Sequence, residues 1–172
     1  MKNNIVIIAG GKGTRIKKTL GDVPKILAPI GNRRIIDIQI DHLKKYNFTN
    51  VHFCLGEGAQ KILKYIENAD INFTYTIEKT PLGTYGALLK AKPYLADSFF
   101  ILYGDIATNY NIKNGFNLFA KDDSDFLLVT RHTDHPEDSD LIKIDHENYI
   151  TKIFREDEVQ YPYAPISCTS LM

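Results

Sequence analysis

Short apolar runs rich in β-branched and aromatic residues recur along the chain, and each is bounded by polar residues or glycine. Runs of this kind are typical of strands buried on both faces of a sheet. The composition agrees, because 44% of the 172 residues are hydrophobic, which is enough for one sizeable core. We therefore expect strands at 5–9, 51–55, 71–77, 99–103 and 126–130.

The segments between these runs carry the period of amphipathic helices, with Ile36, Ile40 and Leu43 on one face of the first. The same pattern recurs at 62–66 and 87–91. Strands that alternate with helices predict a mostly parallel sheet in a three-layer α/β sandwich of Rossmann-like topology. After about residue 125 the helices thin out, and "DLIKID" and "YITKIF" predict an added C-terminal β-hairpin.

The charge balance limits the classes of partner. Lys and Arg together number 21, as do Asp and Glu, so the formal net charge is zero. A balanced charge argues against nucleic acid or an anionic membrane as the partner, and any polyanion should be small and locally held. Cys54 and Cys168 lack a metal-type spacing, and no signal or membrane segment is expected, so we predict a reduced, cytoplasmic protein.

Three glycines follow the first expected strand, at Gly10, Gly11 and Gly13. Backbone N–H groups without side chains can approach phosphate oxygens closely, although a simple glycine turn fits equally well. The spacing excludes two common phosphate loops. Gly13 follows Lys12 where a Walker A loop needs Ser or Thr, and Ile16 stands where a dinucleotide fingerprint needs glycine.

Two cations follow the glycines, Arg15 and, directly after Pro24, Lys25. A guanidinium grips phosphate oxygens in two parallel bonds, whereas an ammonium acts as a movable point charge. Pro24 restricts the backbone of the residue before it and so helps to fix this segment. The combination favours phosphate binding over a pair of merely solvated side chains.

The motifs "AGGKGTR" and "PKILAPIGNRRIID" together resemble the signature of NDP-sugar pyrophosphorylases, which are sugar-1-phosphate nucleotidyltransferases. "EKTPLGTYGAL" at 78–88 resembles their base-binding loop, and "FFILYGD" at 99–105 resembles the strand that ends in a metal-binding aspartate. The resemblance extends to about residue 155. It implies that Arg15, Lys25 and Asp105 are catalytic and that Asp105 binds Mg²⁺. The implied nucleotide-binding residues are Ala9, Gly10, Gly11, Gly13, Thr14, Glu78, Pro81, Gly83 and Thr84.

The side chains of the base loop favour one nucleotide. The Glu78 carboxylate can only accept hydrogen bonds, and guanine offers two adjacent N–H donors, so we expect GTP. The structural alternative is a turn at Pro81 and Gly83 with Thr84 as a helix N-cap. The alternative to metal binding for Asp105 is a structural role in the turn that follows its strand.

The C-terminal part bears on the sugar. "HPEDSDLIKID" followed by "ITKIF" resembles guanylyltransferases that act on heptose or mannose 1-phosphate. Expected sugar-binding residues are Gly104, Asp140 and Arg155. The family usually has a Lys-Pro pair near 155–157, and this chain has Arg155 followed by two acids. The family also continues well beyond this length and supplies a second metal-binding aspartate there.

We therefore expect one domain over 1–172, with a nucleotide-binding half at 1–110 and a partial sugar-binding half at 111–172. The predicted enzyme uses a nucleoside triphosphate and a sugar 1-phosphate. One alternative is a nucleotide-binding module without turnover. Another is a choline-phosphate-type cytidylyltransferase, for which the chain offers no tryptophan to bind a quaternary ammonium. The sequence does not decide between a monomer and a homo-oligomer.

Overall fold

The computed structural model describes residues 2–11, 13, 21–130 and 141–154. The chain divides into two compact units, 1–117 and 118–172. The first contains a parallel sheet and its covering helices, and the second contains a β-hairpin.

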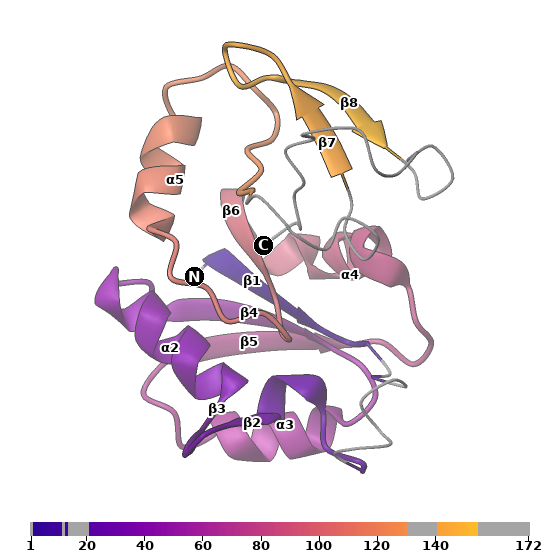
Figure 1. Ribbon diagram of the computed structural model, residues 1–172. Helices are drawn as coiled ribbons and strands as arrows, with labels where there is room; N and C mark the ends of the chain where they lie inside the picture. The colour runs from indigo at the N-terminus through magenta and orange to yellow at the C-terminus, as the bar shows by residue number, and fades with distance from the viewer. Residues whose placement is uncertain (1, 12, 14–20, 131–140, 155–172) are drawn as a thin grey trace. The chain divides into compact units, whose positions relative to one another are not determined.

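The first unit is built on a four-stranded sheet in the order β5-β4-β1-β6, in which every pairing is parallel (Figure 1). Its central strand, β1, pairs Ile7 with Phe53 on one side and with Leu102 on the other. Four predicted strands and the parallel sheet are thus confirmed. The strands are β1 (Asn3–Ala9), β4 (Asn50–Leu55), β5 (Asn72–Ile77) and β6 (Leu95–Tyr103).

The strand predicted at 126–130 is wrong. The segment is not paired in any ladder of the described structure, and the side chain of Phe126 is 84% exposed. An apolar run makes a stable strand only when a neighbouring backbone takes its N–H and C=O groups and a packed layer covers its side chains.

Helices cover both faces of the sheet, as the alternation of side chains along β1 requires. Ile5 and Ile7 point into a core formed with the helices α2 and α3 and with Ile112 of α5, whereas Val6 packs on the opposite face with Ala87 of α4. The three-layer prediction is therefore confirmed for this unit. The helices are α2 (Ile35–Lys45), α3 (Ala59–Ile66), α4 (Gly83–Ala91) and α5 (Ile112–Phe119).

Several short elements connect these layers. Two 3₁₀ turns, η1 (Lys25–Leu27) and η2 (Lys92–Tyr94), precede α2 and β6 respectively, and β2 (Pro29–Ile30) pairs antiparallel with β3 (Arg33–Arg34). The chain runs outward from β1 to β4 and β5 and then returns to β6 on the other side of β1. In an open α/β sheet, ligands bind at such a reversal of strand order, beyond the C-terminal ends of the strands.

A buried polar network lies on the sheet face opposite α2. The fully buried ring of His52 contacts the Thr74 hydroxyl at 2.7 Å and the Thr76 hydroxyl at 3.2 Å, and it stacks on Tyr94. Asn3 Nδ2 donates to the same Thr74 hydroxyl at 2.9 Å. Burial lowers the pKa of His52 to about 4, so the ring is neutral at physiological pH.

The second unit contains the predicted hairpin, which is confirmed. Strand β7 (Leu141–Ile144) pairs antiparallel with β8 (Ile150–Phe154). Asp145 Oδ1 accepts hydrogen bonds from the backbone N–H groups of Glu147 and Tyr149, both at 2.9 Å, and this closes the connecting turn. Of the helices that the structure describes in either unit, none is long and apolar enough to cross a membrane.

Candidate functional site

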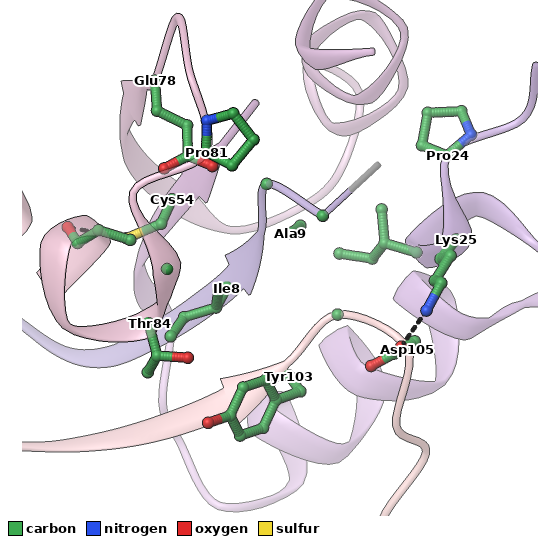
Figure 2. A pocket seen from close by; sticks show the side chains of 16 residues that line it. Ile8, Ala9, Pro24, Lys25, Cys54, Glu78, Pro81, Thr84, Tyr103 and Asp105 are labelled. Carbon is green, nitrogen blue, oxygen red and sulfur yellow. Dashed lines mark hydrogen bonds and ion pairs between the residues drawn. The ribbon is translucent and has the colours of Figure 1, made fainter. Parts of the chain in front are cut away.

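A cavity of about 270 Å³ lies beyond the C-terminal ends of β1 and β6, at the reversal of strand order (Figure 2). The first unit lines it with the end of β1 and its glycine loop, the start of η1, the end of β4, the loop before α4 with α4 itself, and the end of β6. The residues are 8–11, 24–26, Cys54, Glu78, Pro81, Gly83, Thr84, Ala87 and 103–105.

The glycine loop is closely packed at Gly10, whereas no described atom crowds Gly11. A Cβ on Gly10 would lie 2.5 Å from Glu78 Oε1, and a Cβ on Gly56 would lie 2.6 Å from the Gly10 carbonyl oxygen. Gly11 has no described atom within 4 Å of the corresponding position. Gly13 has a φ of +58° and its Cβ position is 3.2 Å from Lys25 Cγ. The loop therefore presents accessible backbone beside a lysine.

Lys25 and Asp105 lie next to each other on one side of the cavity, with Lys25 Nζ 3.0 Å from Asp105 Oδ2 (Figure 2). Lys25 begins η1 directly after Pro24, whose φ of −56° is set by its ring. Asp105 sits in the turn after β6, where Gly104 N donates to the Ile8 carbonyl oxygen at 2.8 Å. Two residues predicted to be catalytic, which lie far apart in sequence, thus form an ion pair.

Glu78 follows β5 and folds over the glycine loop. Its backbone N–H donates to the Leu55 carbonyl oxygen at 2.8 Å, and its Oε2 accepts from Leu82 N at 3.1 Å. The carboxylate therefore closes the loop that contains Pro81. The suggested N-cap role of Thr84 is wrong, since α4 begins at Gly83, with Leu82 as its N-cap residue and no side-chain capping bond.

Six lining residues were not predicted as site residues: Pro24 and Ile26, which flank Lys25, and Ile8, Cys54, Ala87 and Tyr103. Ile8 and Tyr103 adjoin predicted residues, so the signal for them was their position at a strand end. Cys54 and Ala87 form the floor, where Cys54 Sγ lies 3.8 Å from the Ala87 carbonyl oxygen. Burial raises the pKa of the Cys54 thiol to about 11, so it stays protonated and serves as packing.

Four predicted site residues lie outside the described residues: Thr14, Arg15, Asp140 and Arg155. The other predicted residues lie in the first unit, and all of them except Gly13 line the cavity directly. Over the described ranges, no three His, Cys, Asp or Glu side chains group as a metal site. Asp105 alone still fits Mg²⁺, which commonly takes one or two carboxylates together with substrate phosphates.

Comparison with known proteins decides the family. The sequence profile described as "Nucleotidyl transferase" matches residues 4–156. The chain belongs to the nucleotidyl transferase family. The family expected from the glycine loop, Lys25 and the strand before Asp105 is therefore confirmed.

This chain is similar to D-glycero-alpha-D-manno-heptose 1-phosphate guanylyltransferase of Campylobacter jejuni. The two are 32% identical over 102 residues, which are 58% of this chain and 46% of the relative. It is also 27% identical to the bifunctional protein GlmU of Acholeplasma laidlawii, over 92% of this chain and 34% of GlmU. The chain thus spans less than half the length of these curated relatives.

The fold of this chain recurs in solved structures. HddC from Yersinia pseudotuberculosis, crystallised in complex with GMP-PN, matches with a TM-score of 0.76 and 26% identity. The match covers 91% of this chain and 70% of HddC. A putative glucose-1-phosphate thymidylyltransferase from Bacillus anthracis matches with a TM-score of 0.82 at 20% identity, over 96% of this chain and 68% of that one. These likenesses confirm the predicted fold class.

Proposed function

We propose that this chain transfers a nucleoside monophosphate from a nucleoside triphosphate to a sugar 1-phosphate. The preferred triphosphate is GTP and the sugar is of heptose or hexose type. The products are an NDP-sugar and pyrophosphate.

One observation carries the proposal: a single cavity brings together open glycine backbone at Gly11, the ammonium of Lys25 and the carboxylate of Asp105. Backbone N–H groups and a lysine suit phosphate oxygens, and a carboxylate suits the cation that accompanies a triphosphate. A cavity of about 270 Å³ that opens to solvent is close to the lower end of the usual range for small-ligand sites, roughly 300–1,000 Å³.

The chemistry needs no covalent nucleophile from the protein. An oxygen of the sugar 1-phosphate attacks the α-phosphorus, the bond from α-phosphorus to the α,β-bridging oxygen breaks, and pyrophosphate leaves with that oxygen. Lys25 stabilises negative charge near the α-phosphate, and Arg15 is assigned to the pyrophosphate side. When bound, Mg²⁺ supplies further charge neutralisation at the phosphates, with Asp105 as its protein ligand.

Two features support guanine as the base. Glu78 lies beside the glycine loop and keeps lone pairs free beyond the one that its Oε2 gives to Leu82 N. The Campylobacter jejuni relative is named as a guanylyltransferase, and HddC was crystallised with GMP-PN. The same relative is named for a heptose 1-phosphate, which supports the sugar class.

The test is a pyrophosphate-release assay on the purified full chain with Mg²⁺. All four nucleoside triphosphates are crossed with a panel of heptose and hexose 1-phosphates. We expect GTP with one of these sugars to give turnover and the other bases to react more slowly. Tight nucleotide binding without turnover for any pair would overturn the activity and favour a nucleotide-binding module.

A further inference from the structure

A buried glutamine on α2 contacts the turn that holds Asp105. Gln39 is only 2% exposed. Its Nε2 donates to the carbonyl oxygen of Tyr103 at 2.8 Å and to that of Ile106 at 2.7 Å. These two carbonyls flank Gly104 and Asp105, so the amide group of Gln39 is hydrogen-bonded to both ends of the 103–106 turn.

The amide of Gln39 has no other evident task. Its Oε1 is buried and has no hydrogen-bond partner in the described part of the chain. Its neighbours on this face of α2, Ile36, Ile40 and Leu43, belong to the apolar core. A leucine would satisfy the packing at this position, and what it would lack is the pair of N–H donors.

Helix α2 also contacts the other side of the ion pair. Ile35 N donates to the Ala28 carbonyl oxygen at 3.1 Å, and Ala28 N donates to the Lys25 carbonyl oxygen at 2.9 Å. The start of α2 therefore supports the segment of Lys25, and Gln39, one turn later, supports the segment of Asp105. Both members of the ion pair therefore belong to segments that are hydrogen-bonded to α2 or to its start.

We propose that Gln39 is a positioning residue, which fixes the 103–106 turn so that the Asp105 carboxylate is presented to the cation of a nucleotide. This inference rests on the proposed function, because it takes Asp105 as the cation ligand. Ile106 N donates to the Tyr103 carbonyl oxygen at 3.2 Å, so the turn has one bond of its own. Gln39 adds the contact between the turn and the rigid helix.

His42 provides a matched control. It lies on the same helix, and its Nε2 is 2.7 Å from the Tyr110 carbonyl oxygen. A carbonyl only accepts, so this nitrogen carries the proton. The His42 bond thus ties α2 to the same loop beyond Asp105, without contacting the turn itself. His42→Leu removes this bond. It therefore tests whether loosening the loop outside the 103–106 turn also weakens cation binding.

The experiment measures cation binding rather than turnover alone. Mn²⁺ is titrated into the full chain saturated with α,β-methylene-GTP, and bound Mn²⁺ is followed by electron paramagnetic resonance. We expect Gln39→Leu and Gln39→Met to weaken Mn²⁺ binding about tenfold, as loss of a positioning group typically does. His42→Leu should stay within about twofold of the parent. In the activity assay, the Mg²⁺ concentration for half-maximal rate should rise by the factor found for Mn²⁺.

Unchanged Mn²⁺ affinity in the Gln39 variants would overturn the proposal, as would an equal loss in His42→Leu. If the leucine and methionine variants do not fold, Gln39→Glu replaces them. Its protonated carboxyl group donates one bond instead of two, so an intermediate Mn²⁺ affinity is expected, and failure to fold would overturn the positioning role. If the unmutated protein shows no turnover but Mn²⁺ affinity still falls in the Gln39 variants, the proposed function is refuted. The positioning role of Gln39 then still stands.

Discussion

Lys25 Nζ and Asp105 Oδ2 form an ion pair at a separation of 3.0 Å. Both side chains are partly exposed, at 36% and 43%. Such a pair contributes little to stability, so its two charges remain available to a ligand. If the cavity binds a nucleotide and its cation as proposed, we expect a phosphate to compete with Asp105 for the ammonium and the cation to compete with Lys25 for the carboxylate.

Removal of the Asp105 carboxylate should have opposite effects on GTP binding and on turnover. In Asp105→Asn, Lys25 no longer has an anionic partner, so metal-free GTP should bind about fivefold more tightly. Turnover should fall by about 10²–10³ because charge stabilisation in the transition state is lost. Calorimetry and the pyrophosphate assay measure the two effects. Asp97→Asn is the control, since it removes a fully exposed carboxylate elsewhere. Weaker metal-free binding in Asp105→Asn would contradict the competition.

Glu78 offers a test of base recognition that preserves the loop. In Glu78→Gln the amide oxygen still accepts from Leu82 N, so the loop stays closed, but the second carboxylate oxygen is replaced by an NH₂ group that donates instead of accepting from the base. We expect the preference for GTP over the other triphosphates to fall about tenfold, measured as ratios of kcat/KM. An unaltered preference for GTP would mean that groups other than the Glu78 carboxylate recognise the base.

His52 predicts how stability depends on pH. Its pKa is about 4 in the folded chain and 6.5 in the unfolded chain, so between these values the unfolded state binds more protons. Stability is therefore complete above pH 6.5 and falls as the pH drops toward 4, by up to about 3 kcal/mol from this group. The hydroxyl groups that contact the ring belong to Thr74 and Thr76, which do not ionise. Denaturant unfolding from pH 4 to 7 should show a weaker dependence in His52→Gln, and an identical slope would refute the assignment.

The turn between β4 and α3 supports the segment that precedes Lys25. A Cβ on Gly58 would lie 2.8 Å from Pro24 Cγ, and Lys61 Nζ donates to the Asp22 carbonyl oxygen at 2.6 Å. The start of α3 therefore holds the chain that leads to Lys25.

A matched pair of glycines tests this support. Gly58 and Gly31 both have positive φ, at +79° and +59°, so alanine at either position costs about 1–2 kcal/mol of stability. Only Gly58→Ala also pushes against Pro24, because no described atom lies within 4 Å of the Cβ position on Gly31. We expect GTP affinity to fall about tenfold in Gly58→Ala alone. Equal affinities in the two variants would show that the contact is dispensable.

The elements that the sequence predicted are those with a strong local signal. Four β-branched runs became strands, and the faces of α2 and α3 follow from their isoleucines and leucines. Helix α5 escaped prediction because Asn114 and Gly115 weaken its helical pattern. The two-residue strands β2 and β3 are too short to show a period. Gln39 and Gly56 were missed because their partners are distant in sequence, and no local pattern reports such contacts.

All the described residues that we predicted for nucleotide binding lie in the first unit, 1–117. The predicted sugar residues Asp140 and Arg155 fall in the range of the second unit and outside the described residues. Within the described chain, nucleotide binding is therefore expected of the first unit.

Bound nucleotide should stabilise the full chain measurably. A ligand at about 100 times its Kd contributes about 2.7 kcal/mol. For a chain of this size that corresponds to a rise of roughly 5–10 °C in the unfolding midpoint. We expect GTP with Mg²⁺ to give this rise in differential scanning fluorimetry and Mg²⁺ alone to give none. Equal rises with all four triphosphates would refute guanine preference, and no rise with any would refute a nucleotide site.

The central place of β1 has a consequence for biosynthesis. Ile5 is flanked by Val51 on one side and by Phe100 on the other. A ribosome that adds about 5–20 residues per second makes the second neighbour several seconds after the first. During that interval one edge of the nascent β1 is open to misfolding or to capture by a chaperone. The glycine loop and Asp105 come together only when β6 emerges, so the cavity is completed in the last step of sheet assembly.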